Sequence, residues 1–159
     1  MQQMTKYEID RKIDWLGRYL TARRKAQLAK FAVEEARAAA ARTTPVLDGL
    51  PRPSGHSDKV ARAAERLAAA ESACRAAVAD SRQVRAEVEW SISTVGDDVQ
   101  RELLRRRYLM GQSLTEIAEQ MHIEYRWLRR LHRRAAGQAV TRFPPVQGAG
   151  DSGCSGGRI

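Results

Sequence analysis

A heptad repeat of small and apolar residues, which begins at Val60 and ends at Val95, constrains the fold of this chain more than any other feature. One set of its positions, spaced seven residues apart, contains Val60, Leu67, Cys74, Ser81, Val88 and Val95. The other set, three residues farther on, contains Ala63, Ala70, Ala77, Val84 and Ser91. Such a pattern is typical of a helix that packs lengthwise against another helix. The second set is mostly small, so we expect the partner helix to approach closely.

The N-terminal segment, residues 1–42, is predicted to be a first long helix. It carries an apolar stripe at helical spacing, formed by Ile9, Ile13, Leu16 and Leu20 and resumed at Leu28 and Phe31. Residues 43–57 contain three prolines and two glycines, which exclude a regular helix and indicate a linker. The second long helix is predicted over residues 58–96, with Ser57 or Asp58 as its N-cap.

Two arrangements satisfy this pattern. The two long helices can form an antiparallel hairpin within one chain, or the seam can pair with a second copy of the chain as a homodimeric coiled coil. Ala and Arg dominate the composition, and both enter helices at little cost. Both arrangements therefore predict an all-α protein.

Charge and residue types limit the classes of function. The chain has 28 Lys and Arg against 19 Asp and Glu, a formal net charge of +9, which favours a polyanionic partner such as nucleic acid. Cys74 and Cys154 are isolated, and the histidines lack the spacing of metal ligands. No paired carboxylates, phosphate-binding glycine loop or nucleophile–base group is apparent. We therefore expect no enzymatic activity, no catalytic residue, no cofactor and no metal.

The chain contains neither an apolar run near the ~20 residues of a membrane span nor an N-terminal secretory signal. We therefore expect a protein of a reducing cytoplasm with no membrane partner. Residues 141–159 are rich in glycine and are predicted to be a disordered tail.

Residues 97–140 carry the local signals of a small tri-helical, helix-turn-helix domain. Asp97 or Asp98 can cap a first helix, and Gly111 can end it in the left-handed conformation. Ser113 and Glu116 have the spacing of a capping box, which begins a second helix. The residues expected to face inward are Leu103, Leu104, Tyr108, Leu114, Ile117, Ala118, Met121, Leu128, Leu131 and Ala135, with His122 and Ile123 as the turn.

The third helix, residues 124–136, is the predicted DNA-reading element. It contains five arginines and one glutamate, and most of the arginines lie away from its apolar stripe. An α-helix fits the major groove, where Arg can donate two hydrogen bonds to guanine. We expect base contacts from Tyr125, Arg126, Arg129 and Arg130, and backbone contacts from Arg133, Arg134, Arg105 and Arg107. His132 is predicted to lie at the surface, and Trp127 to be partly buried.

This C-terminal unit resembles region four of bacterial sigma factors, which reads promoter DNA. The shared features are Arg107-Tyr108 ahead of the glycine, Ser113-Leu114, the run from Glu116 to Glu119, Ile123, and an Arg-rich helix ending at Arg134-Ala135. The chain up to about residue 136 is similar to small helical proteins of phages and mobile elements, among them late-gene and autolysin regulators. His122, Glu124 and Trp127 depart from the residues usual there. The resemblance implies double-stranded DNA as ligand and host RNA polymerase as a second partner.

The sequence thus leads to the hypothesis of a sequence-specific, DNA-binding transcriptional regulator of phage or mobile-element origin. Two alternatives belong to other classes: a helical adaptor that binds proteins through its long helices, and a DNA-packaging protein similar to small terminase subunits. Packaging proteins of that kind usually carry the helix-turn-helix at the N-terminus, which disfavours the last alternative.

Overall fold

The protein is described by a computed structural model that covers residues 4–43 and 55–141. The elements are α1 (Lys6–Thr43), α2 (Gly55–Ser93), α3 (Asp98–Arg105), the π-helical turn η1 (Arg106–Met110), α4 (Leu114–Gln120) and α5 (Tyr125–Gln138). No strand occurs in these residues, so the predicted all-α class is confirmed. Residues 44–54 of the predicted linker and the predicted tail beyond Thr141 lie outside the described residues. No helix in the described ranges combines the length and the apolar character needed to span a bilayer.

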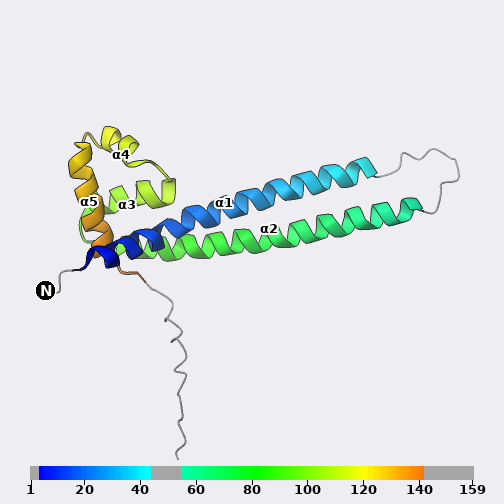
Figure 1. Ribbon diagram of the computed structural model, residues 1–159, viewed down its shortest axis with the longest axis horizontal. Helices are drawn as coiled ribbons and strands as arrows, with labels where there is room; N and C mark the ends of the chain where they lie inside the picture. Colours follow the sequence, from blue (N-terminus) through cyan, green and yellow to red (C-terminus); the bar gives the residue numbers. More distant parts are fainter. Residues whose placement is uncertain (1–3, 44–54, 142–159) are drawn as a thin grey trace, which may run out of the picture.

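The two long helices form an antiparallel hairpin, called the arm below, and the shorter helices are gathered at one end of it (Figure 1). Of the two arrangements that the sequence allowed, the structure shows the hairpin within one chain. The second helix begins at Gly55 rather than at the predicted Ser57 or Asp58 cap. Helical backbone is excluded by the prolines, and the last of them is Pro53. The helix can therefore begin soon after Pro53, earlier than predicted.

The seam of the arm uses heptad positions on both helices. On α2 the predicted positions are buried or half-buried from Ala63 to Val95, and only Val60 is exposed. On α1 the matching positions are Trp15, Tyr19, Ala22, Ala26, Ala29, Val33, Ala36 and Ala40. Ion pairs from Arg18 to Glu87 and from Arg37 to Glu71 cross the seam.

The prediction that Leu28 and Phe31 continue the buried stripe is wrong. Their side chains are 62% and 60% exposed. The residues that face α2 in this part of α1 are Ala26 and Val33. Because alanine is small, α1 and α2 approach closely where Ala26 faces α2. The larger Leu28 and Phe31 lie on the outer face of α1.

The caps predicted for the first two short helices are present, whereas α5 extends to Gln138, two residues beyond the predicted end. The Asp97 carboxylate accepts a hydrogen bond from the Gln100 amide at 2.8 Å, which caps α3. Ser113 and Glu116 form the predicted capping box at the start of α4, with hydrogen bonds of 3.2 and 2.7 Å. Gly111 adopts φ 81°, which ends the preceding helix in the left-handed conformation.

One difference lies just before Gly111, where the chain forms a π-helical turn instead of continuing as an α-helix. The Gln112 amide donates to the carbonyl of Arg106 at 3.0 Å and so extends this wider turn. A π-turn fits an extra residue into a helical turn and shifts the directions of the side chains that follow. Tyr108 lies in it and is only 3% exposed.

Two apolar clusters hold the molecule together. The larger one joins the base of the arm to the short helices, and it contains Trp15, Leu16, Tyr19, Val88, Ile92, Val95, Leu104, Tyr108, Ala135, Ala136 and Ala139. The smaller one lies within the three short α-helices and contains Leu103, Ile117, Ala118 and Leu128. The C-terminal half of α5 therefore packs on the arm, whereas its N-terminal half packs on α3 and α4.

Candidate nucleic-acid interface

The helices α4 and α5 are joined by a tight turn that fixes α5 in place. His122 adopts φ 54°, a left-handed conformation that His tolerates better than β-branched residues do. The Ile123 amide donates to the carbonyl of Ala118 at 2.9 Å, and Ile123 packs against the smaller apolar cluster. Glu124 occupies the N-cap position of α5 but makes no side-chain capping hydrogen bond. The first amides of α5 are thus left without a side-chain cap.

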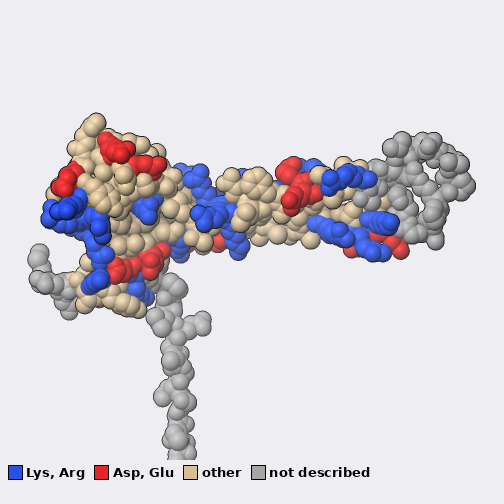
Figure 2. All heavy atoms as spheres, turned by 45° about the horizontal axis from the view of Figure 1, so that its top comes forward, with Lys and Arg blue, Asp and Glu red and all other residues tan. Residues whose placement is uncertain are grey.

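The N-terminal half of α5 presents the four predicted base-contacting residues to solvent. Tyr125 is 44% exposed, and Arg126, Arg129 and Arg130 are all exposed. The guanidinium of Arg129 lies 6.0 Å from the centre of the Tyr125 ring. Within residues 4–43 and 55–141, none of these three arginines makes an ion pair. Figure 2 shows blue atoms at the end of the molecule where α5 lies.

The C-terminal half of α5 is covered by the beginning of α1. The Arg133 guanidinium pairs with the Asp10 carboxylate at 2.9 Å. The Lys12 ammonium donates to the carbonyls of Gly137 and Ala139 at 2.7 and 2.8 Å, and so satisfies the end of α5. Burial lowers the pKa of Lys12, and the Glu8 carboxylate opposes this effect. Most of the exposed side chains of α5 therefore lie in its N-terminal half, and in its C-terminal half only Arg134 and Gln138 are exposed.

The four residues assigned to backbone contacts do not share one surface. Arg134 is exposed on α5, and Arg133 next to it is held by Asp10. Arg107 is half-buried and donates to the carbonyl of Gln112 at 3.0 Å. Arg105 lies at the base of the arm, where it lines a hollow with Tyr19, Arg23 and Arg85. The four residues thus lie on three elements: Arg105 on α3, Arg107 on η1, and Arg133 and Arg134 on α5.

The expectation that His132 lies at the surface is wrong. Its side chain is only 7% exposed, and its Nε2 lies 2.8 Å from the Tyr108 hydroxyl, while the two rings stack. Burial lowers the pKa of His132 to about 4, and the charges of Arg107 and Arg133 act in the same direction. Burial also raises the pKa of Tyr108. Both groups are therefore neutral at physiological pH and link η1 to α5.

Sequence reasoning missed two features of this site. Trp127 is 45% exposed beside the arginines and adds an aromatic surface to the interface. Its place outside the Leu128, Leu131 and Ala135 stripe was the available signal. Asp10 and Lys12, which fix the other end of α5, are distant in sequence, and no local pattern marks them.

The site offers cationic and aromatic groups for binding. The buried pair of Tyr108 and His132 holds α5 in place. Among the described residues, no three His, Cys, Asp or Glu side chains converge as metal ligands. Comparisons with models of protein families, with curated proteins and with solved structures gave no match to this chain.

Proposed function

We propose that this protein is a sequence-specific DNA-binding regulator of transcription, which reads the major groove with the N-terminal half of α5. The observation that carries the proposal is the group formed by Tyr125, Arg126, Arg129 and Arg130, which is exposed and free of ion pairs within the described residues. A helix supported by two others, with its first turns exposed, is the geometry by which helix-turn-helix proteins enter a groove.

The residues divide by role in this proposal. Arg126 and Arg130 lie four residues apart on the outermost face of α5, so they are the candidates for paired hydrogen bonds to guanine. Arg134 continues the same line toward the C-terminus and suits a phosphate. Arg133 is bound to Asp10, so we assign it to holding α5 on the arm rather than to DNA.

The phage or mobile-element origin and the contact with host RNA polymerase rest on the resemblance to sigma-factor region four. Two of the features shared with region four, the residues that cap α4 and the Arg-rich helix, form a capping box and an exposed face in this chain. A regulator of this kind binds near a promoter and recruits or blocks the polymerase.

Selection of bound sequences from a random duplex library, at physiological salt and with the full chain, tests the proposal. We expect one enriched motif. Arg126→Ala and Arg130→Ala should each lose discrimination at one base pair by about 1–3 kcal/mol, because a bidentate contact is lost. Arg134→Ala should weaken all sequences equally.

Arg75→Ala is the matched control, because Arg75 is an exposed arginine on α2, away from α5. It should keep both the motif and the affinity. A library that yields no motif, or a motif that survives loss of both Arg126 and Arg130, would contradict the proposal.

A further inference from the structure

The outer face of α1 carries large apolar side chains that neither the fold nor the proposed DNA contact explains. Leu28 and Phe31 are 62% and 60% exposed, and Met110 of η1 is 65% exposed. All three line one hollow, together with Leu20 and Gly111, at the place where η1 approaches the arm. An exposed apolar patch that faces a concave surface is typical of a site that another molecule covers.

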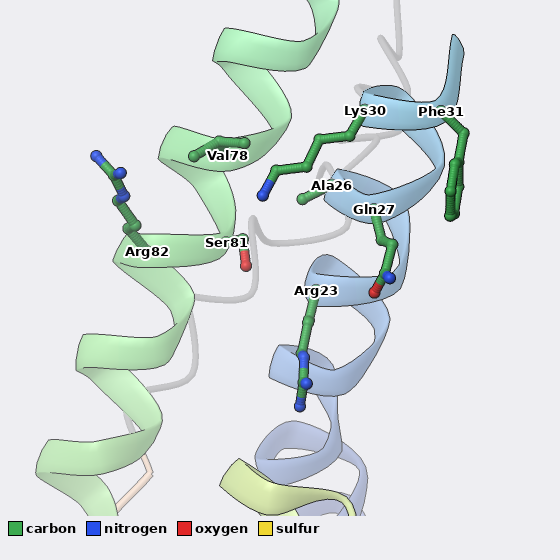
Figure 3. Close-up of a pocket in the computed structure, with 8 residues that line it drawn as sticks. All are labelled: Arg23, Ala26, Gln27, Lys30, Phe31, Val78, Ser81 and Arg82. Atoms are coloured by element: carbon green, nitrogen blue, oxygen red, sulfur yellow. The ribbon is translucent and has the colours of Figure 1, made fainter. Parts of the chain in front are cut away.

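A second hollow lies on the other side of Phe31, between the two helices of the arm. It has a volume of about 420 Å³ and includes Ala26, Val78 and Ser81. Figure 3 shows Ala26 and Val78 in the gap between α1 and α2, Lys30 reaching into it, and Phe31 on its outer side. Both hollows share Arg23, Gln27 and Phe31, so they form one surface that wraps around α1.

The rim of this surface is positively charged. Arg23, Arg24, Lys30 and Arg82 line the two hollows, and no acidic residue lines either of them. None of these four cations makes an ion pair within the described residues. Figure 2 shows mostly blue charged atoms along the arm next to the short helices, whereas red and blue mix farther out. The apolar centre and cationic rim therefore occur together near the base of the arm.

We propose that this surface, centred on Leu28, Phe31 and Met110 and rimmed by Arg23, Arg24 and Lys30, is a docking site for an acidic amphipathic helix of a partner protein. A helix that buries apolar side chains on this patch and places carboxylates on either side would meet both features. Leu20, Arg24, Gln27, Leu28 and Phe31 recur at helical spacing on α1, which gives the partner helix a track about three turns long.

The two other occupants fit less well. Nucleic acid would satisfy the arginines but would leave three exposed apolar side chains against phosphate, which gains little from them. A second copy of this chain would bring a formal net charge of +9 against a surface that is already positive. The site shares no residue with the exposed face of α5, so separate variants can test the two surfaces independently.

The test uses the full chain and a displayed library of random peptides about four helical turns long. Selected peptides should combine acidic and apolar residues at helical spacing. Their affinity, measured by fluorescence anisotropy, should fall by about tenfold or more in Leu28→Ala/Phe31→Ala and in Arg23→Glu/Arg24→Glu. These side chains are exposed, and circular dichroism should confirm that the variants keep their helices.

Two controls separate this proposal from the DNA-binding one. Arg75→Glu changes charge elsewhere on the arm and should leave peptide affinity unchanged, as should Arg126→Ala/Arg130→Ala. A library that yields no acidic amphipathic binder overturns the proposal. Peptides that bind Leu28→Ala/Phe31→Ala and Arg23→Glu/Arg24→Glu with normal affinity overturn it as well. A loss of duplex affinity rather than peptide affinity in Arg23→Glu/Arg24→Glu overturns it as well, since the patch would then extend the DNA footprint.

Discussion

The base of the arm and its distal part are built from the same two helices but are packed differently. At the base, Trp15, Leu16, Val88 and Ile92 are buried and join the cluster that also holds Tyr108 and the end of α5. Farther out, the buried residues include only small ones such as Ala22, Ala26 and Ala77, with Val33 as the largest. Each large buried side chain contributes about 1.5–3 kcal/mol, and an alanine contributes much less.

This comparison shows where the stability of the molecule lies. The base of the arm is the scaffold on which α5 rests, because α5 packs on Leu104 and Tyr108 from one side and on the arm from the other. In the distal part, the two helices extend beyond this scaffold and pack against each other through small side chains. A substitution at the base should therefore affect both the arm and the short helices, whereas one farther out should stay local.

The largest expected effect comes from Leu16→Ala at the base. Leu16 is fully buried, so we expect a loss of about 2–5 kcal/mol in the free energy of unfolding. Urea unfolding, followed by circular dichroism and by tryptophan fluorescence, measures it. Leu28→Ala is the matched control on the same helix and should change stability by less than about 0.5 kcal/mol. Two separate unfolding transitions for arm and short helices would contradict the shared core.

The next largest effect is expected from acid, which should lower the free energy of unfolding through the protonation of His132. The folded pKa of His132 is about 4, below its ordinary value of about 6.5, so the unfolded chain takes up the proton first. Stability is therefore full above about pH 6.5, falls by up to about 3 kcal/mol as the pH drops toward 4, and has no further contribution from His132 below that. Urea unfolding across this pH range should show the fall, and His132→Gln should reduce its slope. An unchanged slope in that variant would argue against a buried neutral imidazole.

Ser113→Ala probes the smaller cluster alone. Its hydroxyl caps α4, so we expect a loss of about 1 kcal/mol in the free energy of unfolding. The capping hydrogen bonds lower the pKa of Glu116 in the folded state. The ionised Glu116 carboxylate therefore contributes to stability, and its contribution is lost as the pH falls through the folded pKa. Duplex affinity measured beside stability shows whether α4 positions α5. A loss as large as that of Leu16→Ala would contradict the expected size of a single capping interaction.

The smallest expected effect is a gain. Ser91 is fully buried in the seam, and its hydroxyl has no hydrogen-bond partner among the described residues. Ser91→Ala should therefore raise the free energy of unfolding by about 1 kcal/mol or less, because an unsatisfied polar group is removed from the base. Thermal unfolding should show a higher midpoint. A lower midpoint would mean that the hydroxyl has a partner in solution.

Much of the fold could be predicted because its signals are local. The caps at Asp97 and Ser113, the left-handed Gly111 and the heptad seam of α2 each depend on residues within a turn or two. Beyond Leu20 the α1 seam was missed because alanines carry little hydropathic contrast. The four exposed residues at the start of α5 also follow from local periodicity.

The sequence by itself determined which segments are helical, which residues cap α3 and α4, and which face of the first turns of α5 carries arginine. These properties depend on backbone geometry and nearest neighbours. Only the tertiary structure decided that Arg133 is held by Asp10, that His132 is buried on Tyr108, and that Leu28 and Phe31 face outward. The physical reason is that burial and pairing depend on which distant segment packs alongside. Here the beginning of α1 covers the C-terminal half of α5 and leaves the N-terminal half exposed.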